Sequence, residues 1–309
     1  MTGPATGADP CFEAWLRGLE ARHLARLRFS EVSQALRALS SAYVERRDRL
    51  ARGAVLDGAG KRAAFALFYA PIHFLVVREI LGRLPSSPRA LDTIVDLGCG
   101  TGAAGAAWAS CLAARPQVVG IDRHHWAIDE AGWTYRVFGL RARARQADVV
   151  RAPLPARRTG IVAAWLVDEM SDDHRQALLA RLLRAAARGA AILIVEPIAR
   201  RAAPWWDAWE RALAQHGGRA DDWRLDLPVP DIVRRLDRAA GLSHDRLTAR
   251  SLWLTNRPPP PARQPTPARP DIEYPEETGA APAAPGDLTD GLDGARRPGV
   301  APSRVALPR

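Results

Sequence analysis

The residues best suited to binding chemistry form one short motif. From Ile94 the chain reads Ile-Val-Asp-Leu-Gly-Cys-Gly-Thr-Gly, an apolar run that leads into three glycines at alternate positions. Glycine allows positive φ angles and a close approach of the backbone to a ligand, so Gly98 and Gly100 predict a tight, ligand-binding turn. Gly102 would let the next helix pack closely against the strand. The motif therefore predicts a strand, a glycine-rich loop and a helix whose N-terminus accepts an anionic ligand group.

Two cofactor classes are compatible with such a loop. Gly98, Gly100 and Ala103 also fit the dinucleotide-binding fingerprint, in which the helix N-terminus holds a pyrophosphate. Asp96 discriminates between the two classes, because a carboxylate just before the turn would repel a pyrophosphate and attract an ammonium group. S-adenosylmethionine (SAM) carries an amino-acid ammonium and carboxylate and no phosphate. The motif therefore favours SAM over a nicotinamide cofactor.

The stretch Val-Asp-Leu-Gly-Cys-Gly-Thr-Gly resembles the first motif of class I SAM-dependent methyltransferases, and the resemblance extends over about residues 91–256. It implies a methyl-transfer enzyme in which the acid matching Asp96 lies near the methionyl amino group and the glycines line the cofactor. The expected cofactor-binding residues are Asp96, Gly98, Cys99, Gly100, Thr101, Gly102, Asp122, Arg123, Ala147, Asp148 and Trp165.

Two acids in this set follow predicted strands. Asp122 ends the run Val-Val-Gly-Ile-Asp, and an acid there can accept hydrogen bonds from both ribose hydroxyls. Asp148 follows the next strand, where the resemblance implies an acid that accepts from the adenine amino group. Acids also commonly close strands and begin turns, so a purely structural role is the alternative for each.

Acids also follow the fourth and fifth predicted strands. Asp168 and Glu169 come after the fourth, and Glu196 ends the fifth. They could orient or deprotonate a substrate at the ligand-binding edge of the sheet, or simply precede a helix N-terminus and a proline stop. Methyl transfer from a sulfonium mainly requires alignment of the acceptor, so we assign no catalytic residue.

Two aromatic clusters admit similar alternatives. Phe68 and Tyr69 precede the first strand, where relatives often close the cofactor site with an aromatic side chain. Trp205, Trp206 and Trp209 could stack a base or line a pocket. Packing against the core is the structural alternative for both clusters.

Strands that alternate with helices after residue 91 predict an α/β fold with a doubly wound, mostly parallel sheet, Rossmann-like as in class I methyltransferases. The predicted strands span 93–97, 117–121, 141–146, 160–166 and 190–196, with a last one at 247–255. The predicted helices span 102–114, 126–138, 172–188, 205–216 and 231–240.

The flanking regions differ from this domain. Residues 1–90 show helical spacing of apolar residues, with Pro71 marking a kink or break, and predict a helical region that could cap the substrate site. Residues 257–309 contain 13 of the 25 prolines and few large apolar side chains, which predicts a disordered tail. The expected organisation is 1–90, 91–256 and 257–309.

The charge and the cysteines bound the function further. The net charge is +10, and residues 257–309 are neutral with seven arginines and seven acids, so the excess lies in 1–256. A basic body favours RNA slightly over a neutral small molecule as the acceptor. The three separated cysteines indicate a reducing compartment and no metal site. We see no apolar run long enough to span a bilayer, so we expect a cytoplasmic protein without membrane contact.

Three functions remain open at this point. The first is a SAM-dependent methyltransferase of unknown acceptor, with RNA slightly favoured and a small molecule as the alternative. The second is a SAM-binding RNA or ribosome assembly factor without turnover. The third is a nicotinamide oxidoreductase, which Asp96 disfavours.

A narrower resemblance concerns the small-ribosomal-subunit-associated methyltransferase-like proteins. Its basis is the helical N-terminal half, Asp168-Glu169 after the fourth strand and the Val195-Glu196-Pro197 ending. That family usually carries clustered cysteines for a metal centre, and this chain lacks them.

Overall fold

A computed structural model of the chain describes residues 9–45, 56–84, 90–155, 157–198, 205–242, 244 and 246–255. All of them belong to one unit, residues 1–262. The predicted tail, residues 257–309, lies outside the described residues.

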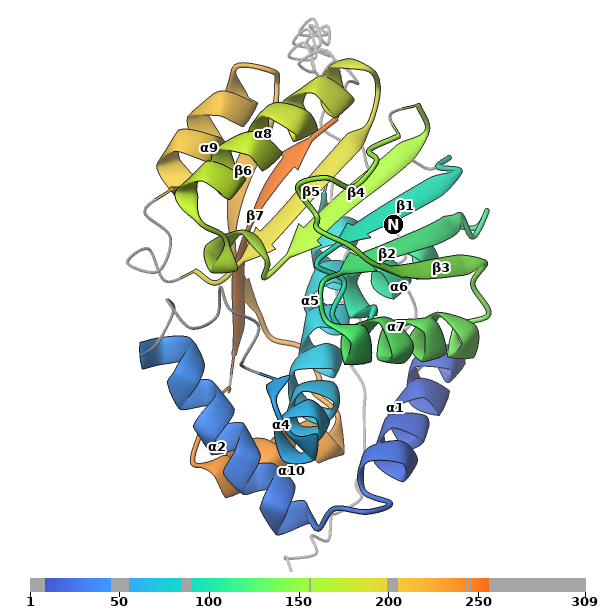
Figure 1. The fold of residues 1–309 in the computed structure, drawn as a ribbon, viewed down its shortest axis with the longest axis vertical. Coiled ribbons are helices and arrows are strands. Elements are labelled where there is room, and N and C mark those ends of the chain that lie inside the picture. Colours follow the sequence, from blue (N-terminus) through green and yellow to red (C-terminus); the bar gives the residue numbers. More distant parts are fainter. Residues whose placement is uncertain are drawn as a thin grey trace, which may run out of the picture. The chain divides into compact units, whose positions relative to one another are not determined.

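Seven strands form one sheet in the order β3-β2-β1-β4-β5-β7-β6 (Figure 1). The strands are β1 (Thr93–Leu97), β2 (Gln117–Asp122), β3 (Ala142–Gln146), β4 (Thr159–Ala164), β5 (Ala191–Glu196), β6 (Arg219–Leu225) and β7 (Leu247–Leu254). Strands β1 to β5 pair in parallel, and β7 lies antiparallel to β5 and β6. The order reverses at β1, so the space beyond the carboxyl ends of β1 and β4 is the expected ligand site.

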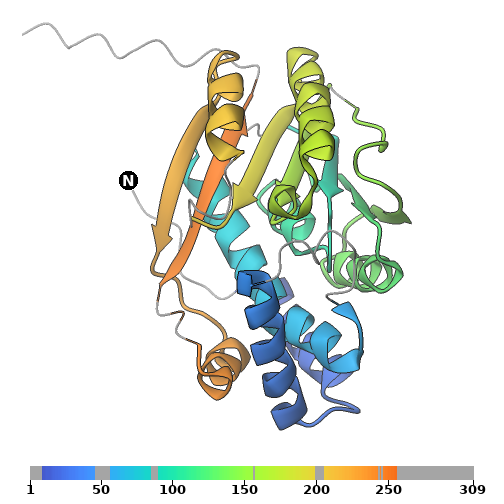
Figure 2. The same ribbon diagram turned by 60° about the vertical axis from the view of Figure 1, so that its left-hand side comes forward.

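Helices cover both faces of the sheet. The helices are α1 (Pro10–His23), α2 (Phe29–Glu45), α4 (Ala59–Ala64), η2 (Phe65–Tyr69), α5 (Ala70–Arg83), α6 (Ala103–Ser110), α7 (His125–Val137), η3 (Val167–Glu169), α8 (Asp172–Ala187), α9 (Trp206–Ala214) and α10 (Asp231–Ala240). Figures 1 and 2 show α8 and α9 over one face, while α6 and α7 contact the strands from the other.

Strand alternation explains this two-sided core. Ile94 and Val118 pack with α5, α6 and α7, whereas Val95 and Leu97 pack with α8 and α9. Neighbouring residues of a strand point to opposite faces, so a fully buried strand such as Ala191–Glu196 needs a cover on each side. The predicted α/β fold with a doubly wound, mostly parallel sheet is confirmed.

One strand was missing from the prediction. β6, with the sequence Arg-Ala-Asp-Asp-Trp-Arg-Leu, lies at the edge of the sheet and is largely exposed. An edge strand with polar side chains on both faces carries no apolar alternation, so its pairing with β7 decides its conformation.

The N-terminal half contributes a long helical run rather than a broken one. Residues 59–83 continue from α4 through the π-helical turn η2 into α5. Of the kink or break predicted at Pro71, the break does not occur: the helix continues through a π-helical turn in which the N–H of Ala70 bonds to the carbonyl of Phe65, five residues back. This wide turn lies directly before the proline and accommodates its ring, as π-bulges do at irregular points of helices.

The same run, Ala59–Arg83, is the one helix among the described residues that is long and apolar enough to cross a membrane by length and composition. Our prediction that no such run exists was therefore wrong. Lys61 and Arg62 interrupt the apolar pattern at the start of this helix, so the sequence does not show one continuous apolar run there. Because 72% of that window is buried inside the structure, it also fits the core helix of a folded domain.

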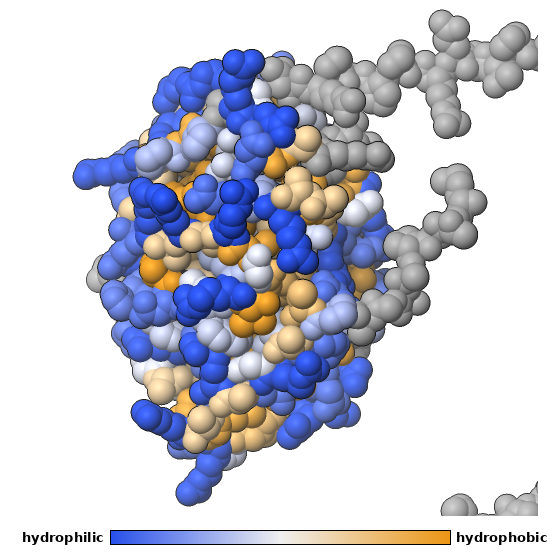
Figure 3. Space-filling model, turned by 90° about the vertical axis from the view of Figure 1, so that its right-hand side faces the viewer, coloured by the Kyte–Doolittle hydropathy of each residue, from blue (hydrophilic) through white to orange (hydrophobic). Residues whose placement is uncertain are grey.

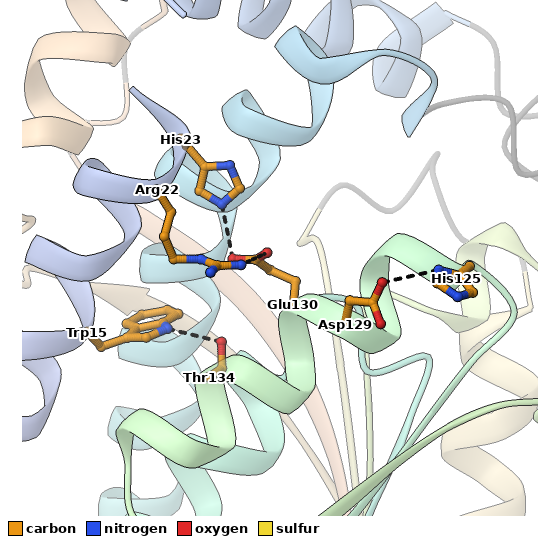
Figure 4. Close-up of polar contacts among 7 residues, drawn as sticks. All are labelled: Trp15, Arg22, His23, His125, Asp129, Glu130 and Thr134. Carbon is orange, nitrogen blue, oxygen red and sulfur yellow. Dashed lines mark hydrogen bonds and ion pairs between the residues drawn. The ribbon is translucent and has the colours of Figure 1, made fainter. Parts of the chain in front are cut away.

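Helix α1 is fastened to α7 by polar contacts (Figure 4). Trp15 Nε1 donates to Thr134 Oγ1 at 3.0 Å in a buried hydrogen bond. Glu130 is 2% exposed, and its carboxylate accepts hydrogen bonds from Arg22 Nη2 and His23 Nε2, each at 3.0 Å. The N-terminal helices thus pack against the same core that supports the sheet.

Candidate functional site

The glycine loop adopts the tight turn that its sequence predicts. Gly98, Gly100 and Gly102 have φ angles of +64°, +49° and +81°. A Cβ atom on Gly98 would lie 2.6 Å from Leu166 Cδ1, and one on Gly102 would lie 2.8 Å from Tyr135 Cε1. Both the backbone conformation and the packing therefore require glycine.

Asp96 is a buried residue next to the glycine loop. Its carboxylate is 1% exposed and does not line the cavity beside the loop. Oδ2 accepts the N–H of Gly105 at 2.8 Å and the hydroxyl of Tyr135 at 3.2 Å. The physical reason is strand alternation, because Asp96 shares a face with Ile94 and points under α6. Burial raises the pKa of Asp96 to about 7.

Asp122 faces the loop from the end of β2. Its Oδ2 accepts the N–H of Gly100 at 2.9 Å, and Oδ1 accepts the N–H of His124 at 2.8 Å. The carboxylate therefore holds the glycine loop and the start of α7 together. It also lines the cavity, where its remaining acceptor capacity can meet ribose hydroxyls.

A cavity of about 730 Å³ opens beside the loop at the carboxyl ends of the strands. Its volume is in the range of small-molecule and cofactor sites. Nine of the eleven expected cofactor-binding residues line it: Gly98, Cys99, Gly100, Thr101, Asp122, Arg123, Ala147, Asp148 and Trp165. The exceptions are Asp96 and Gly102. Gly102 packs instead against Tyr135 and Ala131 of α7.

Asp148 lies at the exposed rim of the cavity. Its Oδ1 accepts the N–H of Val150 at 2.9 Å, and the preceding Ala147 donates its N–H to the carbonyl of Asp122 at 2.9 Å. The ends of β2 and β3 are thereby tied together, so the two predicted acids border the same space.

Aromatic side chains from the N-terminal helical run also line the cavity. Phe65, Tyr69 and His73 line the cavity from η2 and α5, at helical spacing. His73 stacks on Trp165 with ring centroids 3.7 Å apart and planes 6° apart. Burial lowers the pKa of His73 to about 3, so the stack is uncharged near neutrality.

The aromatic prediction for this run was partly right. Tyr69 lines the cavity, whereas Phe68 is fully buried in the core. Phe65 and His73 were missed, and the spacing 65, 69, 73 on one helix face is the signal that could have found them. Trp205, Trp206 and Trp209 do not line the cavity and are at most 8% exposed.

Three further carboxylates line the cavity, those of Asp168, Glu169 and Glu196. Glu196 is 0% exposed, and its Oε1 accepts the N–H of Val167 at 2.7 Å. Asp168 Oδ1 accepts from Trp205 Nε1 at 2.8 Å. Burial raises the pKa of Glu169 to about 7 and that of Glu196 well above its usual range. These acids therefore line the ligand space, as well as preceding a helix.

His124 lines the cavity and His125 pairs with Asp129 on α7. Among the described residues, no group of three or more His, Cys, Asp or Glu side chains is arranged to hold a metal ion.

The strand order, the glycine loop and the acid after β2 define an α/β domain built to bind a nucleoside cofactor. Residues 94–189 match the family described as methyltransferase domain. The chain thus carries a class I, SAM-dependent methyltransferase domain, and the expected family resemblance is confirmed at this level. The narrower resemblance to ribosome-associated proteins stays a prediction.

Several solved structures have a similar fold. A SAM-dependent methyltransferase from Aquifex aeolicus is 15% identical, with 61% of this chain and 93% of that one covered at a TM-score of 0.42. The N-methyltransferase NodS from Bradyrhizobium japonicum, solved with S-adenosylhomocysteine, is 15% identical, with 57% and 85% covered at 0.40. A putative O-methyltransferase from Nostoc punctiforme is 13% identical, with 71% and 72% covered at 0.46. No curated protein matches the chain significantly.

Proposed function

We propose that this domain transfers the methyl group of SAM to an uncharged, hydrogen-bonding group of RNA, such as a nucleobase. The observation that supports this most is the composition of the 730 Å³ cavity. The glycine loop, Asp122, the His73–Trp165 stack and three further carboxylates all line this one space.

The glycine loop and the acids at the ends of the neighbouring strands fit SAM. Glycine backbone approaches the cavity without side chains, and Asp122 offers acceptors for ribose hydroxyls. Asp148 at the rim would accept from the adenine amino group. When bound, SAM supplies an already activated methyl group, so the chain's own residues need only bind, orient and exclude water.

The charge of the cavity lining favours a neutral acceptor group. The cavity lining carries five carboxylates (Asp122, Asp148, Asp168, Glu169 and Glu196) and one arginine, Arg123. A phosphate or carboxylate would be repelled there, whereas a base that offers N–H donors would be accepted. A base that contacts the aromatic wall would gain about 1–3 kcal/mol from stacking. Glu169 lines the cavity and burial raises its pKa to about 7, so we propose it as the group that accepts a proton where the acceptor arrives protonated.

A small-molecule acceptor is the second candidate, and the helical cover favours it. Leu56, Phe65, Tyr69 and His73 border the cavity from the N-terminal half. Such a cover suits a compact acceptor that is enclosed entirely. It suits RNA only if one base leaves its stack and enters the cavity, as RNA- and DNA-modifying enzymes require.

Two measurements test the proposal. Calorimetry should detect binding of SAM and of its demethylated product, and tight NAD binding without SAM binding would overturn the cofactor assignment. The protein is then incubated with methyl-labelled SAM and total cellular RNA, or with a small-molecule extract. We expect label in nucleosides after RNA digestion. Label confined to the small-molecule fraction would support the second candidate, and SAM binding without any transfer would support the non-catalytic assembly factor.

A further inference from the structure

Three arginines form a row along the β3 edge of the sheet. Arg141 directly precedes β3, and Arg143 and Arg145 follow at alternate positions. All three side chains are exposed, whereas the intervening Ala142 and Ala144 pack toward the core on the α7 side. Residues two apart on a strand project to the same face about 6.6 Å apart, so the row extends over about 13 Å.

The row lies on a part of the sheet that the described helices leave open. Arg143 pairs in register with Val119 and Arg145 with Ile121, which belong to the core on the α8 side. The helices of that face, α8 and α9, contact β5, β6 and β7 and lie over the other half of the sheet (Figure 1). Figure 3 faces the β3 side of the molecule, where strongly hydrophilic side chains project between apolar patches.

These arginines are not used to stabilise the fold. Arg22 and Arg158 bind carboxylates, and Arg181 binds backbone carbonyls of the segment after β3. By contrast, the described part of the chain offers no hydrogen bond or ion pair to the guanidinium groups of Arg141, Arg143 and Arg145. Three unpaired cations in line on one strand are available to an external anion.

The row leads toward the cavity. Ala147 and Asp148, which line the cavity, follow Arg145 by two and three residues on the same chain segment. A nucleic-acid strand whose phosphates lie along β3 would therefore reach the mouth of the cavity within one or two nucleotides. Its phosphates would remain outside the acidic cavity, while a base could enter it.

We infer that Arg141, Arg143 and Arg145 form a binding track for the phosphodiester backbone of a single-stranded nucleic acid. The identification of that strand as the methyl acceptor rests on the proposed function, but the binding track itself does not. An extended line of separated cations beside an aromatic-lined cavity is the arrangement that single-strand binding uses. RNA and DNA share this backbone chemistry, and the experiment distinguishes them.

The test measures the binding of fluorescein-labelled single-stranded RNA and DNA of mixed sequence to the full chain by anisotropy. In R141Q/R143Q/R145Q we expect the Kd for RNA to rise at least about tenfold and the slope of log K against log salt to become shallower by about 2, as for three lost phosphate contacts. The matched control is R211Q/R224Q/R238Q, which removes the same charge from exposed positions on α9, β6 and α10. The control should change affinity much less, because α9 and β6 lie at the opposite edge of the sheet and α10 packs against α2, so none of the three positions adjoins β3.

The outcomes distinguish binding by this row of arginines from non-specific attraction by the net positive charge of the protein. Equal losses in the two triple variants, or no RNA binding by the wild type at low salt, would overturn the track. R141K/R143K/R145K should keep most of the affinity, and a loss as large as that of the glutamine variant would also overturn it. SAM binding should be unchanged in every variant, because none of these arginines lines the cavity. If the wild type binds RNA but not SAM, the proposed function fails while the track stands. If the wild type binds DNA and RNA with equal affinity, the track recognises the phosphodiester backbone and does not distinguish RNA from DNA.

Discussion

The carboxylate of Asp96 accepts the backbone N–H of Gly105 at 2.8 Å, from inside the turn that joins β1 to α6. Through this contact, the acid of the first motif stabilises the conformation of the glycine loop. The loop's shape, rather than a charge directed at the ligand, is therefore what Asp96 provides in this structure.

We first predict a change in the pH dependence of stability for Asp96→Asn. The pKa of Asp96 is about 7 in the fold and about 4 in an unfolded chain. A raised pKa means that the unfolded state releases its proton first, so this group's stabilisation is complete below about pH 4 and is lost as the pH rises to about 7. The free energy of unfolding should therefore fall less between these values in the variant, as urea titrations can measure.

The amide oxygen that replaces the carboxylate in Asp96→Asn would still accept from Gly105, so the variant should fold. Only the slope of the unfolding free energy against pH tests this prediction, because the new amide N–H groups would lower stability at every pH. Identical slopes for the two proteins would show that Asp96 is ionised normally in the fold.

Our second prediction concerns the lack of space for a side chain at Gly102 in the glycine loop. Gly102→Ala combines a φ of +81° with a Cβ only 3.1 Å from the backbone Cα of Ala131. Gly241→Ala is the matched control, since its φ is +69° and nothing lies within 4 Å of its Cβ position. Left-handed strain alone costs about 1–2 kcal/mol, and the clash should add about 1–3 kcal/mol. Denaturant unfolding that gives equal losses would contradict this packing.

The third prediction tests the acid at the end of β2. Asp122→Ala removes the acceptor for Gly100 and His124 and leaves the cavity without that carboxylate. We expect the affinities for SAM and its demethylated product to fall by about 1–3 kcal/mol, the scale of hydrogen bonds to a charged acceptor. Calorimetry of Asp207→Ala, an exposed acid on α9, provides the control. Unchanged affinity in Asp122→Ala would remove Asp122 from the cofactor site.

A fourth prediction concerns the attachment of α1 to α7. Burial would raise the pKa of Glu130, but the hydrogen bonds from His23 and Arg22 outweigh it and hold the pKa below its usual value. The stabilisation from this carboxylate is therefore present above its usual pKa and is lost as the pH falls through the lowered value. At pH 7, Glu130→Gln should cost about 1–2 kcal/mol, since Arg22 is partly solvated.

Asp129→Asn is the neighbouring control. Asp129 pairs with His125 on the exposed surface of the same helix (Figure 4), so its loss should cost less than about 0.5 kcal/mol. If both variants unfold at the same urea concentration, the Glu130 contacts contribute nothing to the attachment of α1.

The local pattern of the chain was sufficient to predict the central part of the fold. Mostly apolar runs such as Ile94–Leu97 and Ala191–Val195 indicate buried strands, and glycines at alternate positions indicate a turn that favours glycine. Both signals are contained within a few neighbouring residues. The acids after β2 and β3 were found for the same reason, since a residue at the carboxyl end of a parallel strand must lie at the ligand-binding edge.

Tertiary structure decided what depends on residues far apart in the chain. His73 meets Trp165 across 92 positions only because the helical run 59–83 packs over the carboxyl edge of the sheet. The direction of Asp96 depended on the face that α6 covers, and β6 became a strand by pairing with β7. Chain composition determined the excess of arginine, but the sheet order decided that Arg141, Arg143 and Arg145 share an edge without partners among the described residues. Contacts of this kind depend on which surfaces packing brings together, and short-range sequence patterns do not encode that choice.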